Sequence, residues 1–263
     1  MVDMSVDILR GVEATAHDAP DRLAHVWRHD RLTYRQLWLQ SGRLAAQLRD
    51  TPAGAPIIVH GHKQSLMLVC FLASLRAGHP YVPVDSSIPA SRLTEIVDAA
   101  EAPLLLAIDP VAANLEPRVI GRDELQELCG IDSPPPPPDE EVRPDEPQYI
   151  IFTSGSTGRP KGVQISRQAV NNLAAWTLSM VSVPRQTGNE VFLNQAPFSF
   201  DLSVFELASA LASGGTIVSV DKNHIADLPT LFVELPDSGV TVWVSTPSFA
   251  DLCLANPQFN ATL

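Results

Sequence analysis

The segment Thr153–Gly162 carries the clearest chemical signal in the chain, because hydroxyl side chains, glycines and one lysine alternate along it. Glycine lets the backbone approach an anion closely, and hydroxyl groups donate hydrogen bonds to it. We predict a polyphosphate-binding loop. A Walker A loop needs Gly-Lys followed by Ser or Thr at a helix start, whereas here Pro160 precedes Lys161 and Gly162 follows it. The predicted phosphate contacts are Thr153, Ser154, Gly155, Ser156, Thr157, Gly158 and Lys161.

A second candidate site is Asp201, a single carboxylate within the aromatic and aliphatic run Phe198–Leu207. An aspartate before a helix is commonly just its N-cap. However, Ser203 and Glu206 have the spacing of a capping box, which would leave Asp201 free. A carboxylate in apolar surroundings is costly unless it meets a cation. We therefore predict that Asp201 binds a substrate ammonium group.

The elements that must position these residues alternate between short branched runs and helical patterns, which indicates an α/β fold with mainly parallel sheets flanked by helices. The predicted strands lie within 21–30 and at 57–59, 81–84, 104–108, 149–152, 163–165, 191–193, 216–220 and 240–244. The predicted helices are 33–49 with Thr33 as N-cap, 65–77, 89–100, 167–180, 202–211, 229–235 and 248–254. Residues 133–148 are rich in proline and acidic side chains, so we expect a linker between a lobe at 1–132 and a lobe at 149–263.

Composition limits the classes of partner. The formal net charge is −12, so nucleic acids and anionic membranes are not expected partners. The apolar run Leu66–Leu75 is shorter than the roughly 20 residues that span a bilayer, and no signal peptide is recognisable. The three cysteines are widely spaced, which suggests neither disulfides nor a zinc site and fits the cytoplasm. We expect no metal ligands, because His60 and His62 lack further ligands nearby.

The segment Thr153–Gly162 resembles the phosphate-binding loop of the adenylate-forming superfamily, which includes acyl-CoA synthetases, luciferases and the adenylation domains of peptide synthetases. Composition alone fits an ordinary surface turn equally well, and the order of the residues favours the functional loop. The resemblance implies the fold of the superfamily's N-terminal core. It implies that ATP and Mg²⁺ take part, and that Lys161 has a catalytic role at the phosphates.

The run around Asp201 resembles the motif of amino-acid adenylation domains in which an aspartate binds the substrate α-amino group. Carried over by position, Asp201 would hold the ammonium group, while Leu202 and Phe205 would line the side-chain pocket; Val244 is a further candidate for that lining. Fatty acyl-CoA synthetases have no amino group to bind, so the resemblance favours the amino-acid branch. Residues 74–85 and 88–93 resemble an early scaffold motif of the same domains.

Three runs, Pro56–Lys63, Phe192–Val204 and Val242–Phe249, resemble the ligases that charge a carrier protein with D-alanine for teichoic acid D-alanylation. Such ligases form an aminoacyl-AMP from a small amino acid and ATP, then transfer the aminoacyl group to the phosphopantetheine thiol of an acyl or peptidyl carrier protein. The large Phe205 and the apolar Val244 leave an alternative hypothesis open, in which the substrate is another small amino acid, as in nonribosomal peptide biosynthesis.

Members of the family that this sequence resembles extend beyond the position of Leu263. We therefore expect this chain to lack the adenine, ribose and magnesium contacts and the C-terminal lobe. A catalytically incomplete nucleotide-binding fragment is a second hypothesis, and an acyl-CoA synthetase is a third.

Overall fold

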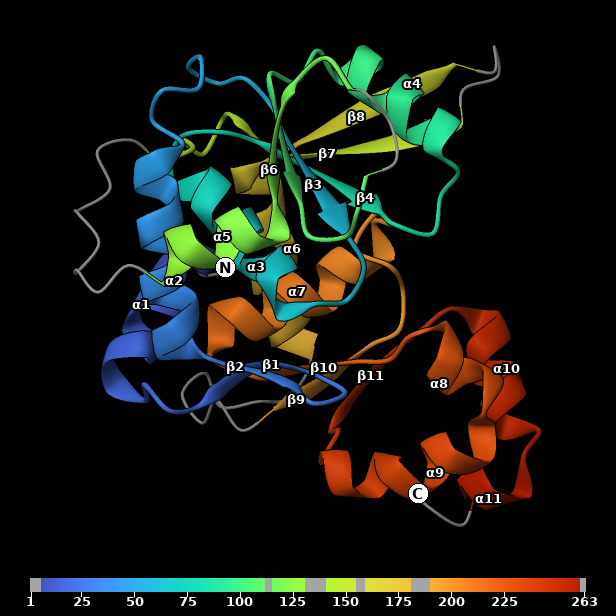
Figure 1. Cartoon of the computed structure of the whole chain (residues 1–263). Helices are drawn as coiled ribbons and strands as arrows, with labels where there is room; N and C mark the ends of the chain where they lie inside the picture. The colour runs from blue at the N-terminus through green and yellow to red at the C-terminus, as the bar shows by residue number, and fades with distance from the viewer. Residues whose placement is uncertain (1–5, 112–114, 131–140, 155–158, 181–189, 261–263) are drawn as a thin grey trace.

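The computed structural model describes residues 6–111, 115–130, 141–154, 159–180 and 190–260, and it contains two mostly parallel sheets (Figure 1). The five-stranded sheet has the order β11 (Val242–Val244), β9 (Val191–Asn194), β10 (Thr216–Ser219), β1 (Leu23–Trp27) and β2 (Asp30–Thr33). The six-stranded sheet has the order β6 (Arg118–Gly121), β5 (Leu104–Ala107), β3 (Ile57–Gly61), β4 (Tyr81–Asp85), β7 (Pro147–Ser154) and β8 (Pro160–Ser166). Within the described ranges, only the pairs β1–β2 and β7–β8 are antiparallel. The predicted α/β class with mainly parallel sheets is confirmed.

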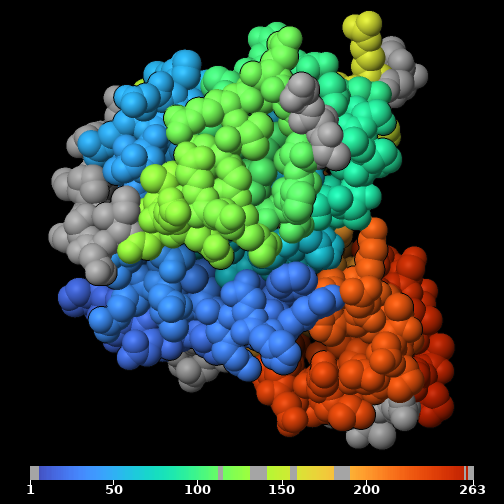
Figure 2. All heavy atoms as spheres, viewed as in Figure 1, coloured from blue at the N-terminus to red at the C-terminus, as the bar shows by residue number. Residues whose placement is uncertain are grey.

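Helices fill the space between the two sheets and cover their outer faces (Figure 1). The inner helices are α1 (Ile8–Asp18), α2 (Tyr34–Gln47), α3 (Ser65–Arg76), α6 (Arg167–Met180) and α7 (Leu202–Ser213), with α5 (Arg122–Cys129) packed against α2. Helix α4 (Ala90–Ala100) covers the outer face of the six-stranded sheet. The outer side of the five-stranded sheet carries α8 (Lys222–Ala226), α9 (Leu228–Ser238), α10 (Pro247–Leu254) and α11 (Pro257–Asn260), which form a distinct bulge in Figure 2 (orange to red).

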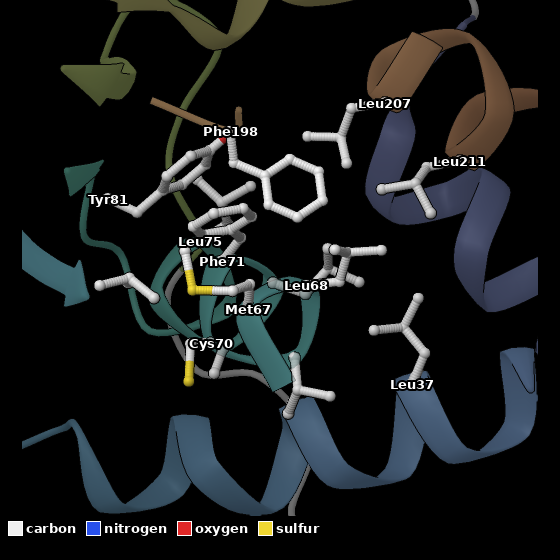
Figure 3. Packing of buried hydrophobic residues seen from close by; sticks show 14 of the residues in the cluster. Leu37, Met67, Leu68, Cys70, Phe71, Leu75, Tyr81, Phe198, Leu207 and Leu211 are labelled. Atoms are coloured by element: carbon white, nitrogen blue, oxygen red, sulfur yellow. The ribbon is translucent and has the colours of Figure 1, made fainter. Parts of the chain in front are cut away.

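Helix α3 lies at the centre of the main core. All of its residues from Met67 to Arg76 are buried, as expected for a helix that is apolar on every side. Phe71 stacks on Tyr81 with ring centroids 4.3 Å apart and meets Phe198 edge-on at 5.7 Å (Figure 3). These contacts join α3 both to the six-stranded sheet and to the segment that leads into α7. The predicted buried helix is confirmed.

Local sequence signals located most of the elements. Thr33 caps α2 in a capping box with Gln36, as each residue's side-chain oxygen accepts from the other's backbone N–H. The predicted N-cap is therefore confirmed. No predicted helix or strand corresponds to α1, β2, β6, α5, α8 or α11. Strand β3 extends beyond the predicted range 57–59, so His60 is a buried residue of this strand.

Both sheets take strands from either side of residues 133–148, the predicted linker. Strands β1 and β2 of the N-terminal half pair into the sheet of β9, β10 and β11, while β7 and β8 join β4 of the N-terminal half. The sheets therefore do not divide at this linker, of which residues 133–140 lie outside the described residues. No helix among the described residues is long and apolar enough to cross a membrane.

Helix α1 contacts α7 at Gly11, where no side chain would fit. A Cβ atom on Gly11 would lie 2.7 Å from the backbone carbonyl oxygens of Leu211 and Ala212. We expect Gly11→Ala to force the two helices apart and to lower the free energy of unfolding by about 1 to 3 kcal/mol, measured by urea denaturation. Gly121→Ala is the control, because its Cβ would meet no atom within 4 Å. Equal stability of Gly11→Ala and the wild type would contradict this close packing.

Candidate functional site

The β7–β8 hairpin carries the predicted phosphate loop at its tip. Thr153 pairs with Lys161 and Ser154 with Pro160 in the antiparallel register, so both ends of the loop are fixed by the sheet. Thr153, Ser154 and Lys161 are exposed. Gly155, Ser156, Thr157 and Gly158 lie outside the described residues. The strand expected to precede the loop is confirmed, and the phosphate contacts stay predictions.

A cavity of about 510 Å³ lies beside the base of this hairpin. Its walls are mainly apolar, and they come from β4, α4, β7, β8 and the segment before α7. Thr153 and Ser154 line it together with Asp201. The fold thus places one predicted substrate-binding residue and part of the predicted phosphate loop around one cavity. The lining residues are Pro83, Val84, Asp85, Ile88, Arg92, Ile96, Tyr149, Ile151, Phe152, Thr153, Ser154, Val163, Ile165, Ser199, Phe200 and Asp201.

Asp201 stands at the N-terminus of α7, but its side chain does not cap the helix. Its backbone is already helical, with φ −59° and ψ −30°, whereas a capping residue has extended dihedral angles. The predicted Ser203–Glu206 capping box is wrong. Ser203 donates to the Phe200 carbonyl oxygen, and Glu206 is buried and accepts from Asn194. The exposed carboxylate of Asp201 nevertheless makes no capping hydrogen bond.

The other predicted substrate contacts are not among the residues that line this cavity. Leu202 and Phe205 are half-buried on α7, next to Asp201 in sequence. Val244 is buried on β11, where it pairs with Asn194 of β9. A side-chain pocket made by these three residues stays a prediction.

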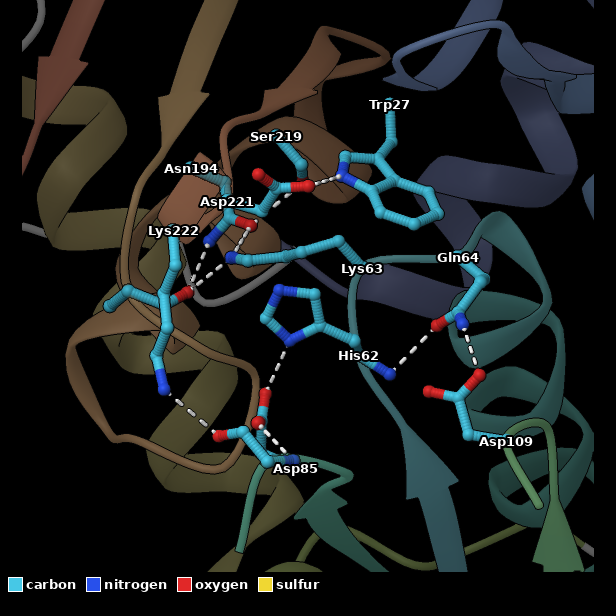
Figure 4. A network of polar contacts seen from close by, with 12 residues as sticks. Trp27, His62, Lys63, Gln64, Asp85, Asp109, Asn194, Ser219, Asp221 and Lys222 are labelled. Atoms are coloured by element: carbon cyan, nitrogen blue, oxygen red, sulfur yellow. Dashed lines mark hydrogen bonds and ion pairs between the residues drawn. The ribbon is translucent and has the colours of Figure 1, made fainter. Parts of the chain in front are cut away.

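A buried lysine close to the site went unpredicted (Figure 4). The Nζ atom of Lys63 donates to the side-chain oxygen of Asn194 and to the backbone oxygen of Ala196. It also lies 4.7 Å from the centroid of the Phe198 ring. Burial lowers the pKa of Lys63, and the negative charges of Glu206, Asp85 and Asp221 oppose that shift. The only sequence signal was a lysine placed directly before a strongly apolar helix.

Asn194 connects Lys63 to two further buried groups. Its Nδ2 atom donates to Oε1 of Glu206 at 2.6 Å, and its Oδ1 atom accepts from the Ser219 hydroxyl at 2.8 Å. Burial raises the pKa of Glu206, opposed by the Asn194 hydrogen bond and by the charge of Lys63. His25 contacts the hydroxyls of Ser219 and Ser65, and burial lowers its pKa to about 3. The imidazole is therefore neutral at physiological pH.

Asp85 lines the cavity and forms a hydrogen bond with the His62 ring (Figure 4). His62 Nδ1 lies 2.7 Å from Asp85 Oδ2, and the backbone N–H of Ser87 donates to Oδ1 at 2.9 Å. Burial by itself raises the pKa of Asp85, but these two partners outweigh it and lower the pKa to about 2. The cavity wall therefore keeps this carboxylate charged.

No group of three or more His, Cys, Asp or Glu side chains that could hold a metal ion occurs in the part of the chain that the structure describes. Cys70, Cys129 and Cys253 are buried free thiols.

Two mostly parallel sheets, and a cavity lined by the β7–β8 hairpin and Asp201, characterise the chain. The family model of AMP-binding enzymes matches residues 12–262. The chain belongs to the AMP-binding enzyme family.

Within the family, the sequence is similar to D-alanine–D-alanyl carrier protein ligases. It is 43% identical over 258 residues to the ligase of Bacillus licheniformis, with 97% of this chain and 51% of the relative aligned. The Bacillus anthracis ligase is 41% identical over 259 residues, and the alignment again covers 97% of this chain and 51% of the relative. The chain therefore spans about half the length of these curated relatives.

Solved structures have the same fold. A nonribosomal peptide synthetase, FmoA3, superposes with a TM-score of 0.83 at 27% identity, over 98% of this chain and 28% of that one. The N-terminal subdomain of NpsA from Klebsiella oxytoca, in complex with 3-hydroxybenzoyl-AMSN, gives 0.76 at 24% identity, over 90% of this chain and 59% of that one. At this lower identity the likeness concerns the fold alone.

The low pKa of Asp85 makes stability depend on pH. An unfolded aspartate has a pKa of about 3.9, so the charged group stabilises the fold above pH 4, and this contribution is lost as the pH falls toward 2. We expect Asp85→Asn to cost about 2 kcal/mol at pH 6 and progressively less between pH 4 and pH 2. Urea denaturation at a series of pH values measures this. A pH-independent difference would contradict the assigned shift.

Proposed function

We propose that the full-length protein activates D-alanine with ATP and transfers it to a carrier protein. The observation that carries the proposal is that Asp201 and the base of the phosphate hairpin line one cavity. An isolated carboxylate suits an ammonium group, and the hairpin suits a polyphosphate. The similarity to D-alanine–D-alanyl carrier protein ligases over 97% of the chain supports the choice of amino acid.

In the first half-reaction, a carboxylate oxygen of D-alanine attacks the α-phosphorus of ATP, and the bond to the bridging oxygen breaks. The products are D-alanyl-AMP and pyrophosphate, which leaves with the electron pair. Such chemistry depends on positioning and on neutralising the charge of the phosphates. Lys161 and the hydroxyl and backbone donors of residues 153–158 would hold the β- and γ-phosphates. Asp201 would orient the ammonium group, and Leu202, Phe205 and Val244 would surround the methyl group.

In the second half-reaction, the phosphopantetheine thiol of the carrier attacks the D-alanyl carbonyl carbon, and AMP leaves. The product is a D-alanyl thioester, which would serve teichoic acid D-alanylation. We expect this work to take place in the cytoplasm, where ATP is available. Mg²⁺ is expected to accompany ATP, but the described residues form no metal site, so no step is assigned to the ion.

A second candidate is a discrete adenylation domain that uses another amino acid in nonribosomal peptide biosynthesis. The superposition on FmoA3 over 98% of the chain favours it. Exchange of labelled pyrophosphate into ATP, measured on the full-length protein with a panel of D- and L-amino acids, separates the two functions. D-alanine as the best substrate supports the first, and another amino acid supports the second. A 263-residue native product without exchange activity would support the incomplete nucleotide-binding fragment.

Lys161 provides the first test of the mechanism. We expect Lys161→Ala in the full-length protein to slow D-alanine-dependent pyrophosphate exchange on the order of 100-fold, because a positive charge at the phosphates is lost. Arg118→Ala removes an equally exposed charge from β6 and is the control. Unchanged exchange in Lys161→Ala would reject the catalytic role.

Asp201 provides the second test. We expect Asp201→Asn to raise the KM for D-alanine on the order of 10-fold, a loss of about 1.4 kcal/mol, because the charge that would pair with the ammonium group is removed. The KM for ATP should change much less. Asp123→Asn, an exposed carboxylate on α5, is the control. A KM for D-alanine equal to that of the wild type would show that Asp201 does not bind the ammonium group.

A further inference from the structure

Lys63 bridges the two sheets at the point where the substrate sites meet. It follows β3 of the six-stranded sheet, which also carries the phosphate hairpin. Its acceptors, Asn194 and Ala196, lie at and just after the end of β9 in the five-stranded sheet. Figure 4 shows the side chain extended from the β3 end toward Asn194. Lys63 is 1% exposed and Asn194 is fully buried, so water does not compete for these bonds.

The amine of Lys63 is held on three sides. Two of its hydrogens have oxygen acceptors on Asn194 and Ala196, and the ring face of Phe198 lies within cation–π distance. All three partners belong to the segment 194–198, which leads directly to Asp201. Lys63 therefore fixes the start of the segment that ends at Asp201, the residue predicted to bind the substrate ammonium group.

Glu206 fixes the other end of the same segment. It lies on α7, five residues after Asp201, is fully buried, and accepts from Asn194 through Oε1. Its second oxygen, Oε2, has no hydrogen-bond partner among the residues that the structure describes. An unsatisfied carboxyl oxygen is costly in a core. The hydrogen bond from Asn194 to Oε1 offsets part of that cost.

The segment between these anchors contains two further backbone turns. Phe200 donates to the Pro197 oxygen at 3.0 Å, and the N–H of Val204 donates to the Asp201 oxygen at 3.0 Å. The carboxylate of Asp201, by contrast, makes no capping bond and is exposed at the cavity. The position of Asp201 is thus set by its backbone, and the backbone is set by Lys63, Asn194 and Glu206.

From these contacts we infer that Lys63 and Glu206 are positioning residues: through Asn194 they hold Asp201 at a fixed place relative to the phosphate hairpin. This inference rests on the proposed function, since Asp201 must bind the amino acid for its position to matter. Reacting groups gain most when they are held close to the geometry of attack. A shift of α7 relative to the six-stranded sheet would move the amino acid away from ATP without removing any substrate contact.

The test is steady-state pyrophosphate exchange with the full-length protein. We expect Lys63→Met, which keeps the length of the side chain, to lower kcat/KM for D-alanine about 10-fold or more and to leave the KM for ATP within about twofold. We expect Glu206→Gln to lower kcat/KM about threefold, because the amide oxygen still accepts from Asn194 while an NH₂ group takes the place of Oε2. Glu206→Gln keeps the test decisive if Lys63→Met does not fold.

A matched core variant separates positioning from stability. Leu125→Ala removes a fully buried side chain from α5 and is expected to lower the melting temperature while leaving both KM values unchanged. If Lys63→Met and Glu206→Gln lowered the melting temperature but left the kinetics for D-alanine unchanged, as in Leu125→Ala, the positioning role would be overturned.

A double-mutant cycle tests whether Lys63 acts through Asp201. If it does, Lys63→Met adds little to the defect of Asp201→Asn, because the carboxylate that it positions is already lost. Full multiplication of the two defects would overturn the inference. If the wild type showed no exchange with any amino acid, the proposed function itself would be rejected. If the wild type were active but the Lys63→Met and Asp201→Asn defects multiplied fully, the positioning role alone would be rejected.

Discussion

The amine of Lys63, buried between two sheets, constrains the rest of this structure. Removing an amine from water is unfavourable unless hydrogen-bond acceptors replace the solvent. Lys63 is accommodated because Asn194 and Ala196 supply such atoms from the opposite sheet, and because Phe198 presents a ring face. Each of these groups must keep its position relative to the end of β3 for the contacts with Lys63 to form. The lysine therefore fixes the position of β9 and of the segment before α7 relative to the six-stranded sheet.

The interleaved path of the chain explains why such a bridge is needed. The N-terminal strands β1 and β2 complete the sheet of β9, β10 and β11, and the hairpin β7–β8 extends the sheet of β3 and β4. The two sheets are held together mainly by the apolar helices between them, with α3 buried from Met67 to Arg76. Apolar packing is not directional, whereas the hydrogen bonds around Asn194 require specific positions. The polar network therefore adds orientation to a core that supplies most of the stability.

Sequence reasoning was most successful where a local rule applied. The capping box at Thr33 and the apolar run of α3 depend on neighbouring residues, and both were located correctly. It failed where a local rule competed with a distant partner. The spacing of Ser203 and Glu206 fits a capping box, yet Asn194 takes the carboxylate because the packing of α7 against β9 brings the two together. The short helices α8 and α11 have too few residues to show a periodic pattern.

By itself the sequence determined the α/β class, and it predicted the phosphate loop and the ammonium-binding aspartate, because each of these is inferred from the types and order of adjacent residues. Only the tertiary structure decided that the hairpin and Asp201 border one cavity and that Lys63 joins their two sheets. These relations depend on which strands pair across the chain. The pairing is set by the burial of the whole apolar surface at once, and no local segment contains that information.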